Sequence, residues 1–370
     1  MHRENCVVTL ARDSQTDVHG HDHVSRTAMA QRLAEILGYA FAGEFTPAQR
    51  YPDHVYFVPQ DTLLHAHAQT LGIRGERDLF GGVVPDRFVG TKAITHATPD
   101  RSAPTPPRWS HHLADALRDM VLPGYSAFSS ADAQRAGRLL LPHGRVRIKP
   151  AHALGGSGQQ VAADHTELDG AIAALDEAAT REHGVTIEIN IEQPRTLSIG
   201  EVRVAGIDLA YHGTQRVVTN HAGEEVYGGS DLHIVRGRMA DLLALDAPPA
   251  LRRAVEQVLA YDAAIEAAFP DFFASRRNYD VLQGEDGAGE FVSGVLEQSW
   301  RLGGASPAEI AALRAFHRDP SLRLVAASSY ETYAEQPRVP DDALVHYDAV
   351  DPRAGRLCKY SRVHAVVTDA

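Results

Sequence analysis

The first hundred residues alternate short apolar runs with amphipathic stretches, a pattern that is typical of α/β proteins. Residues 7–10 form an apolar run that predicts a buried strand, and the polar residues 19–23 follow it as a loop. Apolar side chains then recur at helical spacing up to Leu37, and Gly38 ends the predicted helix. Residues 55–58 predict a second strand. This order of strand, helix and strand favours a parallel sheet with a right-handed crossover.

A proline-rich stretch at residues 99–107 marks a boundary, and the pattern beyond it mixes strands with capped helices. Two helix starts resemble capping boxes, namely Ser129 with Asp132 and Thr166 with Asp169. The strands predicted beside these helices are residues 146–149 and 186–191. We therefore expect a second structural unit that ends near residue 190.

The last part of the chain combines a long helix with a β-hairpin. Apolar residues at helical spacing predict a helix over residues 251–265. Strands are predicted at residues 278–283 and 290–297, on either side of a turn that contains two glycines. Ser306, followed by proline and then by Glu309, predicts a helix with a serine N-cap.

The composition and net charge of the chain limit the kinds of partner that it is expected to bind. Hydrophobic residues make up 44% and charged residues 23%, as in ordinary soluble globular proteins. The net charge of −12 argues against a nucleic-acid binder that relies on a broad basic surface. No apolar run approaches the roughly 18 residues of a membrane span, and the N-terminus has no signal-peptide pattern. The 2 cysteines cannot form a disulfide framework, so we expect a cytoplasmic protein without nucleic-acid or membrane partners.

Two carboxylates of the predicted hairpin are candidates for a metal site. If the turn is centred between Ala288 and Gly289, Asp280 and Glu297 face each other across the strands. Their Cβ atoms then lie about 4.5–5.5 Å apart, and the two charges repel unless a cation lies between them. Mg²⁺ bound by carboxylates and phosphates suits such a pair, although a surface hairpin with scattered acids explains the pattern equally simply.

A glycine-rich loop follows the predicted strand that ends at Lys149. Gly155, Gly156, Ser157 and Gly158 allow backbone N–H groups to approach phosphate oxygens closely, and the lysine adds a positive charge. The lysine precedes the glycines, so this is not a Walker motif. An ordinary surface turn is the alternative.

The segment from Glu297 to Ser306 leads through Ser299, Arg301 and a glycine pair into a helix N-terminus. Such an end presents free N–H groups and the positive pole of the helix dipole, which stabilise a phosphate or carboxylate. A strand that runs through an ordinary loop into a capped helix is the alternative. The histidine-rich residues 19–23 likewise allow a substrate contact, an ordinary loop or a metal site.

The order of these features resembles the ATP-grasp superfamily over residues 85–306. In that superfamily two lysines and a glycine-rich flap bind phosphates, a hinge strand binds adenine, and a late acid with a Glu-x-Asn-x-Arg segment holds Mg²⁺. The resemblance implies these nucleotide-binding residues: Lys92, Lys149, Gly155, Gly156, Ser157, Gly158, Glu188, Asn190 and Glu192. It also implies Asp280, Glu297 and Ser299 as metal ligands, with Arg301 and Lys149 as catalytic residues. Ser299 stands where the superfamily has asparagine, and its shorter side chain weakens one metal contact.

The resemblance also implies a fold and an activity. The expected α/β architecture has three parts: a Rossmann-like N-terminal unit (residues 1–100), a lid (101–190) and a catalytic unit (191–370). The expected enzyme uses ATP and Mg²⁺ to activate a small-molecule carboxylate as an acylphosphate, which an amine or thiol then attacks. The alternative functions are an ATP-grasp kinase and a nucleotide-binding regulator. A homodimer is an open alternative for the oligomeric state. Residues 227–232 match no feature of the superfamily.

Overall fold

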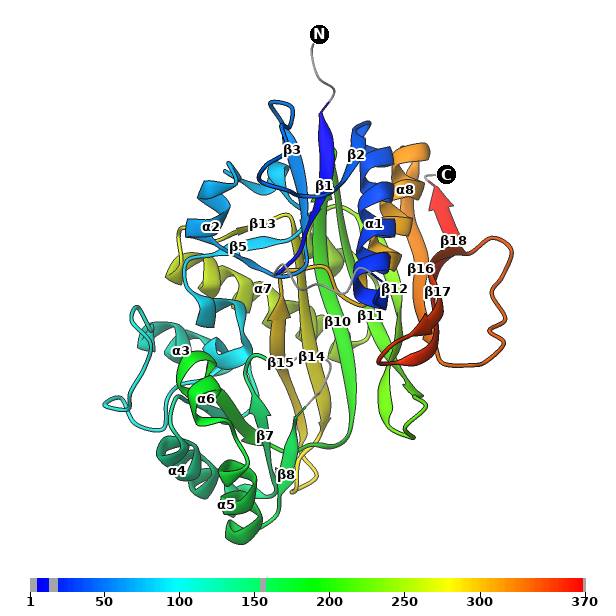
Figure 1. Cartoon of the computed structure of the whole chain (residues 1–370). Helices are drawn as coiled ribbons and strands as arrows, with labels where there is room; N and C mark the ends of the chain where they lie inside the picture. Colours follow the sequence, from blue (N-terminus) through cyan, green and yellow to red (C-terminus); the bar gives the residue numbers. More distant parts are fainter. Residues whose placement is uncertain (1–4, 13–18, 154–157, 369–370) are drawn as a thin grey trace.

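A computed structural model describes residues 5–12, 19–153 and 158–368. Its largest element is an antiparallel sheet of eight strands in the order β15-β14-β10-β11-β12-β16-β18-β17 (Figure 1). The strands are β10 (Glu192–Val204), β11 (Ile207–Thr219), β12 (Glu225–Arg236), β14 (Arg276–Glu285), β15 (Phe291–Ser299), β16 (Leu322–Thr332), β17 (Leu344–Asp351) and β18 (Gly355–Thr368).

Different helices cover the two faces of this sheet. The predicted long helix is present as α7 (Pro249–Ala268) and packs on one face, whereas α8 (Ser306–Arg318) packs on the other, with α1 (His21–Leu37) beside it (Figure 1). Side chains alternate along a strand, so neighbouring residues of β11 enter different cores. Ala210 packs among the residues on the α7 side, and Tyr211 packs on the α8 side.

The N-terminal strands form the predicted parallel sheet. β1 (Cys6–Leu10) pairs in parallel with β3 (Val55–Pro59), and Gly38 ends α1 in the left-handed conformation. β2 (Ala40–Glu44), which the pattern did not predict, adds a third strand. The expectation of a loop at residues 19–23 is wrong for its second half, because His21 is the first residue of α1. The His21 N–H donates to Asp351 on β17 at 2.8 Å, so a distant carboxylate satisfies this helix start.

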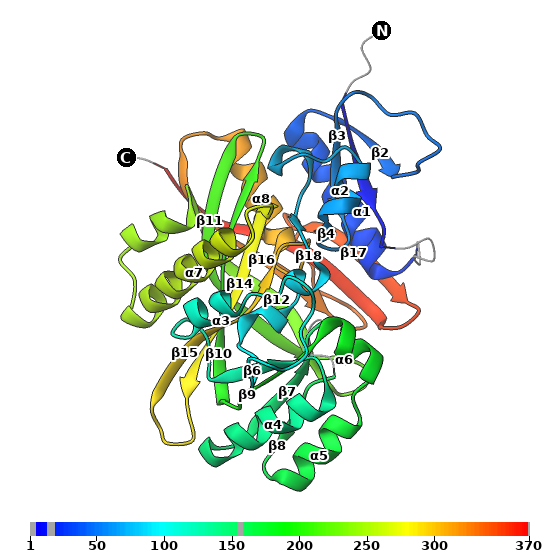
Figure 2. The ribbon, with the colours of Figure 1, turned by 90° about the vertical axis from the view of Figure 1, so that its left-hand side faces the viewer.

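A four-stranded sheet in the order β6-β9-β7-β8 lies at the opposite end of the eight-stranded sheet from the N-terminal sheet (Figure 2). Ser129 caps its first helix as predicted, since its hydroxyl accepts the Asp132 N–H at 3.1 Å. The predicted capping by Thr166 is wrong. Asp164 is the N-cap instead, and its carboxylate accepts the N–H groups of Thr166 and Glu167 at 2.8 and 2.9 Å. The elements are β6 (Gly124–Ala127), β7 (Val146–Pro150), β8 (Gln160–Ala162), β9 (Val185–Ile189), α4 (Ser130–Leu140), α5 (His165–Ala173) and α6 (Glu177–His183).

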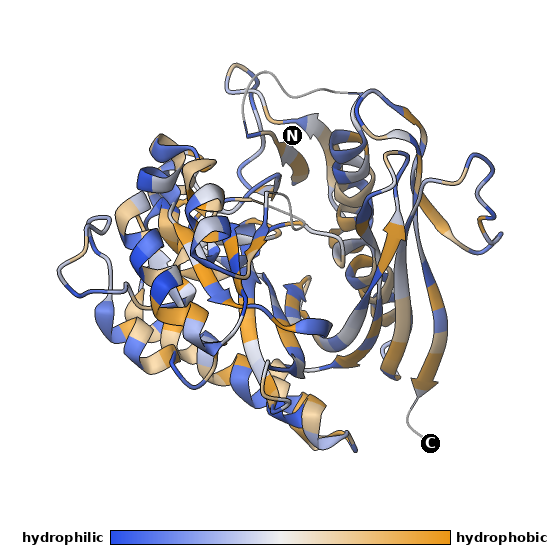
Figure 3. Cartoon of the chain, turned by 90° about the horizontal axis from the view of Figure 1, so that it is seen from below, coloured by the Kyte–Doolittle hydropathy of each residue, from blue (hydrophilic) through white to orange (hydrophobic). Residues whose placement is uncertain are grey.

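Short elements join these sheets. They are β4 (Leu63–Leu64), β5 (Gly82–Val84), β13 (Phe273–Ala274), α2 (His65–Thr70), α3 (His111–Leu117) and the 3₁₀ helices Glu76–Asp78, Arg87–Gly90, Lys92–Thr95, Leu141–His143 and Met239–Ala244. Apolar residues concentrate in the sheets and on the inner sides of the helices (Figure 3). Within the three described stretches, no helix is long and apolar enough to cross a membrane.

Candidate active site

The two candidate carboxylates lie opposite each other on the hairpin. Asp280 on β14 pairs with Glu297 on β15, while the next pair is Val281 with Val295. One extra residue, Leu296, therefore forms a bulge in β15. The predicted pairing is present, but this bulge creates it, because the register nearer the turn is offset by one residue.

Hydrogen bonds hold the Asp280 side chain in place, but its surroundings offset little of its negative charge. The Ser198 hydroxyl donates to its Oδ1 at 3.1 Å, and the Asn278 amide nitrogen donates to the same atom at 3.0 Å. Burial and the nearby Glu297 raise the pKa of Asp280. A cation between the two carboxylates would relieve this repulsion. No cluster of three or more His, Cys, Asp or Glu side chains that could hold a metal occurs in the described stretches, so an ion here needs further oxygen ligands such as phosphates.

Lys92 reaches this carboxylate pair from the 3₁₀ helix Lys92–Thr95. Its Nζ lies 2.8 Å from Glu297 Oε2 and donates to the carbonyl of Ala153 at 3.0 Å. The side chain is 6% exposed. Lys92 thus connects the metal candidates with the loop that leads into the predicted flap.

Lys149 lies in a separate buried network on the four-stranded sheet. Its ammonium forms an ion pair with Glu188 on the neighbouring strand β9, and the His96 ring lies 2.9 Å from the other Glu188 oxygen. Burial alone would raise the pKa of Glu188, but Lys149 and His96 outweigh it and lower that pKa to about 2. Gly124 makes room for the His96 ring, since a Cβ atom there would lie 2.8 Å from it. His96 was not predicted from the sequence.

The remaining hinge candidates lie apart from both lysines. The Asn190 side chain accepts from Arg147 at 2.8 Å and donates to Glu192, which also pairs with Arg145 at 3.1 Å. Asn190 and Glu192 line a pocket of about 560 Å³ that the turn of the β14–β15 hairpin borders. In the predicted flap, Gly155, Gly156 and Ser157 lie outside the described residues, and Gly158 adopts a positive φ of 68°.

Two further pockets meet at Glu297, Ser299 and Arg301, which line both. The first, of about 120 Å³, extends from Lys92 toward the N-terminal sheet. The second, of about 500 Å³, lies over the eight-stranded sheet and reaches Tyr227. Burial lowers the pKa of Arg301, whose Nη1 donates to the Leu302 carbonyl at 2.7 Å.

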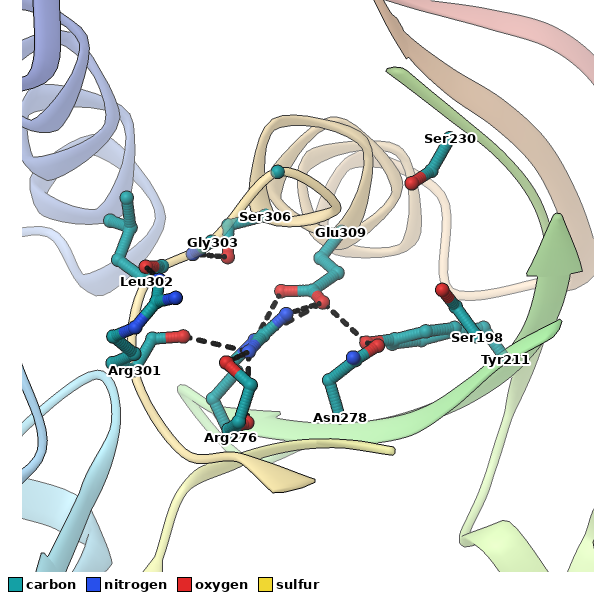
Figure 4. Close-up of polar contacts among 12 residues, drawn as sticks. Ser198, Tyr211, Ser230, Arg276, Asn278, Arg301, Leu302, Gly303, Ser306 and Glu309 are labelled. Carbon is teal, nitrogen blue, oxygen red and sulfur yellow. Dashed lines mark hydrogen bonds and ion pairs between the residues drawn. The ribbon is translucent and has the colours of Figure 1, made fainter. Parts of the chain in front are cut away.

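A buried ion pair supports the wall between these pockets (Figure 4). Arg276 on β14 and Glu309 on α8 are 1% and 0% exposed, and their closest approach is 2.8 Å. Arg276 Nη1 also donates to the carbonyls of Ser299 and Arg301 at 3.0 and 2.7 Å. Tyr211 donates to Glu309 at 2.5 Å. The ion pair therefore fixes the segment that carries both predicted site residues.

The predicted serine N-cap at Ser306 is wrong. The N-cap of α8 is Ala305, and the Ser306 hydroxyl instead accepts the N–H of Gly303 at 3.1 Å. Glu309 is not a capping residue either, because Arg276 holds it in the core. Sequence reasoning missed Arg276 and Asn278, although strand alternation offered a signal: positions 276, 278 and 280 lie on one face of β14.

The unassigned segment at residues 227–232 belongs to the second pocket. Tyr227 packs against the start of α8, where a Cβ atom on Gly304 would lie 2.4 Å from its ring. Its hydroxyl lies 2.7 Å from Ser230 Oγ and 3.2 Å from Ser329 Oγ. The segment therefore forms a wall of the pocket beside the carboxylates.

Comparisons with known proteins identify a family that matches this chain and solved structures that share its fold. The model of a family described as "Protein of unknown function (DUF3182)" matches residues 7–361. A search of curated proteins found no match.

Three solved structures illustrate the structural similarity. D-alanyl-alanine synthetase A from Vibrio cholerae has a TM-score of 0.53 at 13% identity, covering 86% of this chain and 94% of its own. Biotin carboxylase from Campylobacter jejuni, in a β,γ-ATP complex, has a TM-score of 0.54 at 11% identity, covering 96% and 87%. The biotin carboxylase domain of Hydrogenobacter thermophilus 2-oxoglutarate carboxylase, solved with MgADP, ADP and bicarbonate, has a TM-score of 0.50 at 14% identity, covering 96% and 86%. These are ATP-grasp enzymes, so the chain has the expected ATP-grasp fold and α/β class.

Proposed function

We propose that this chain, which belongs to the DUF3182 family and has the ATP-grasp fold, is an ATP- and Mg²⁺-dependent ligase. It activates a small carboxylate for attack by an amine or thiol. One observation carries the proposal: Glu297 and Arg301 line both pockets, and Glu297 has a charged neighbour in each of them. Lys92 lines the first pocket and pairs with Glu297, and Asp280 lines the second and lies opposite Glu297. This arrangement offers two phosphate-binding charges beside a site for a divalent cation.

The residues divide into phosphate-binding and metal-binding roles. Lys92 and Lys149 bind phosphate oxygens, and they exchange their present carboxylate partners for the nucleotide. Asp280 and Glu297 fit Mg²⁺ because they are opposed oxygen ligands, and Asp280 is buried beside the charge of Glu297. A Mg²⁺ ion held by these two residues would offset negative charge on the phosphates. Support for ATP and Mg²⁺ comes from neighbouring folds solved with these ligands.

The proposed reaction has two steps. A substrate carboxylate oxygen attacks the γ-phosphorus of ATP, the bond to the β-phosphate oxygen breaks, and ADP leaves an acylphosphate behind. The nucleophile then attacks the acyl carbon, inorganic phosphate leaves, and the nucleophile loses its proton. Arg301 stabilises negative charge on the transferred group from its position between the pockets. The second pocket holds the substrate, with its carboxylate near Arg301 and the start of α8.

The experiment begins with nucleotide binding. ATP with Mg²⁺ should raise the melting temperature at millimolar concentration, and EDTA should diminish that rise. Glu297→Gln should remove the Mg²⁺-dependent part of this rise in melting temperature, because it deletes one of the two opposed charges. Glu256→Gln, an exposed change on α7 at a residue that lines none of these pockets, serves as the matched control and should behave like the wild type. If no nucleoside triphosphate shifts the melting temperature, the proposal fails.

Product analysis then identifies the reaction class. Pairs of small carboxylates with amines or thiols are screened for ADP release. An amide or thioester with ADP and phosphate supports the ligase. A phosphorylated substrate with ADP identifies a kinase, and binding without turnover across the screen identifies a regulator.

A further inference from the structure

Gln298 lies between Glu297 and Ser299 on β15, and strand alternation turns its side chain toward the opposite face of the sheet. It pairs in register with Tyr279 on β14, whose ring packs in the core on the α7 side. Gln298 is 6% exposed. A buried amide is costly unless its polar atoms have partners, so these partners show what the side chain holds in place.

Each polar atom of the Gln298 amide has a partner. Its Nε2 donates to the carbonyls of Val89 at 3.1 Å and Thr91 at 2.8 Å, and its Oε1 accepts from the Tyr261 hydroxyl at 3.0 Å. A carbonyl oxygen can only accept, so the two carbonyls fix the amide nitrogen on their side. The Tyr261 hydroxyl gives its one proton to Gln298, and its oxygen lies 3.4 Å from the Thr95 hydroxyl, which donates to it.

These partners lie on both sides of Lys92 in the chain. Val89 and Thr91 precede the lysine, and Thr95 follows it. Thr91 also caps the 3₁₀ helix that begins at Lys92, because its hydroxyl accepts the Ala93 N–H at 3.2 Å. One side chain of β15 therefore holds both ends of residues 89–95, directly at one end and through a tyrosine at the other.

This attachment does not depend on the charge at the end of the Lys92 side chain. The Lys92 ammonium lies 2.8 Å from Glu297, and in the proposed function it exchanges this carboxylate for a phosphate oxygen. The ion pair then no longer holds residues 89–95, whereas the hydrogen bonds of Gln298 to carbonyl and hydroxyl groups persist. A lysine side chain is long and flexible, so the position of its backbone determines which atoms it can reach.

We propose that Gln298 is a positioning residue for Lys92. From the far side of the strand that carries Glu297, its amide fixes the backbone segment from which the lysine reaches the nucleotide phosphates. The inference rests on the proposed function, because it concerns a lysine assigned to phosphate binding. Gln298 acts through Lys92, since protein groups already occupy its own amide.

A double-mutant cycle tests this inference. The affinity for a non-hydrolysable ATP analogue with Mg²⁺ is measured by calorimetry. Gln298→Met keeps the length of the side chain but donates no hydrogen bond, and it should weaken binding at least about fivefold, because small displacements of a positioned group are costly. In the Lys92→Ala background the same change should have less than about a twofold effect. Equal effects in the two backgrounds would overturn the inference.

Gln257→Met is the matched control for the loss of a buried glutamine. Gln257 on α7 is 5% exposed, and its amide donates to the Ser293 carbonyl at 2.8 Å and accepts from the Ser293 hydroxyl at 2.6 Å. This partner belongs to β15 and not to residues 89–95. The control should lower the melting temperature, as Gln298→Met does, but leave the affinity for the analogue within about twofold of the wild type. An equal loss of affinity would contradict a specific role for Gln298.

The phosphorus NMR spectrum of the bound analogue gives a readout that general destabilisation does not move. At saturation, Gln298→Met should shift the phosphate resonances in the same direction as Lys92→Ala, because both variants lose the lysine contact. Gln257→Met should leave them at the wild-type positions. If Gln298→Met fails to fold, Tyr261→Phe removes one hydroxyl from the same hydrogen-bond chain and should give a smaller shift in that direction. An unchanged spectrum and affinity in the variant that folds would overturn the inference.

The two proposals fail in different ways. If the wild type does not bind the ATP analogue, the proposed function is lost, and the inference with it. If the wild type binds the analogue and Lys92→Ala weakens binding, but Gln298→Met binds as the wild type does, the positioning role alone is lost.

Discussion

Glu309→Gln provides a stringent test of how the site is held together. The change keeps the size of the side chain but removes its charge, and it leaves the Arg276 guanidinium buried without a counter-ion. Removing one partner of such a pair typically costs about 3–5 kcal/mol in the free energy of unfolding. At about 2.1 cal/mol/K per residue over the 370 residues, the entropy of unfolding is about 0.8 kcal/mol/K. The expected fall in melting temperature is therefore about 4–6 °C.

The assay is calorimetry together with urea unfolding, and two further variants give the comparison. Glu35→Gln breaks two ion pairs, with Arg32 and Arg314, but the glutamate is 50% exposed, and the change should cost less than about 1 kcal/mol. The double variant Arg276→Met with Glu309→Leu should recover much of the lost stability, because no unpaired charge then remains in the core. A cost for Glu309→Gln as small as that for Glu35→Gln would refute the reasoning.

Two other predictions concern the lysine network and the pocket wall. The pKa of Glu188 is about 2 in the folded protein, below its ordinary value of 4.5, so the stability it contributes is complete above about pH 4.5 and is lost as the pH falls toward 2. Glu188→Gln should flatten the acid dependence of the melting temperature in that window; an unchanged profile would contradict the ion pair with Lys149. Gly304→Ala should cost about 1–3 kcal/mol by urea unfolding, because the new methyl group collides with Tyr227. Gly287→Ala is the control, because a Cβ atom there would only make an ordinary van der Waals contact of 3.7 Å with the His143 carbonyl. It should change stability by less than about 0.5 kcal/mol, so equal costs would refute the clash.

Local patterns in the sequence were sufficient to predict the elements that bury one face against a core. The parallel pair β1 and β3, the helix α7 and the hairpin of β14 and β15 all follow from apolar spacing and turn residues. The Ser129 cap was also predicted, because its partner lies three residues away. The facing of Asp280 and Glu297 was also predicted, but from a turn centre that is offset by one residue, and the bulge at Leu296 restores the pairing. These features depend on neighbours within a few residues or across one turn.

The tertiary structure decided every feature whose partner is distant in the chain. Asp351 completes the first turn of α1, although 330 residues separate it from His21. Glu309 has the sequence position of a capping residue, yet Arg276 on a strand 33 residues earlier draws it into the core. A hydrophobic pattern shows which face of an element is buried, but it contains no information on which charge from another element will meet that face. The pairing of buried charges, and with it the geometry of this site, is therefore set only when the sheets and helices pack.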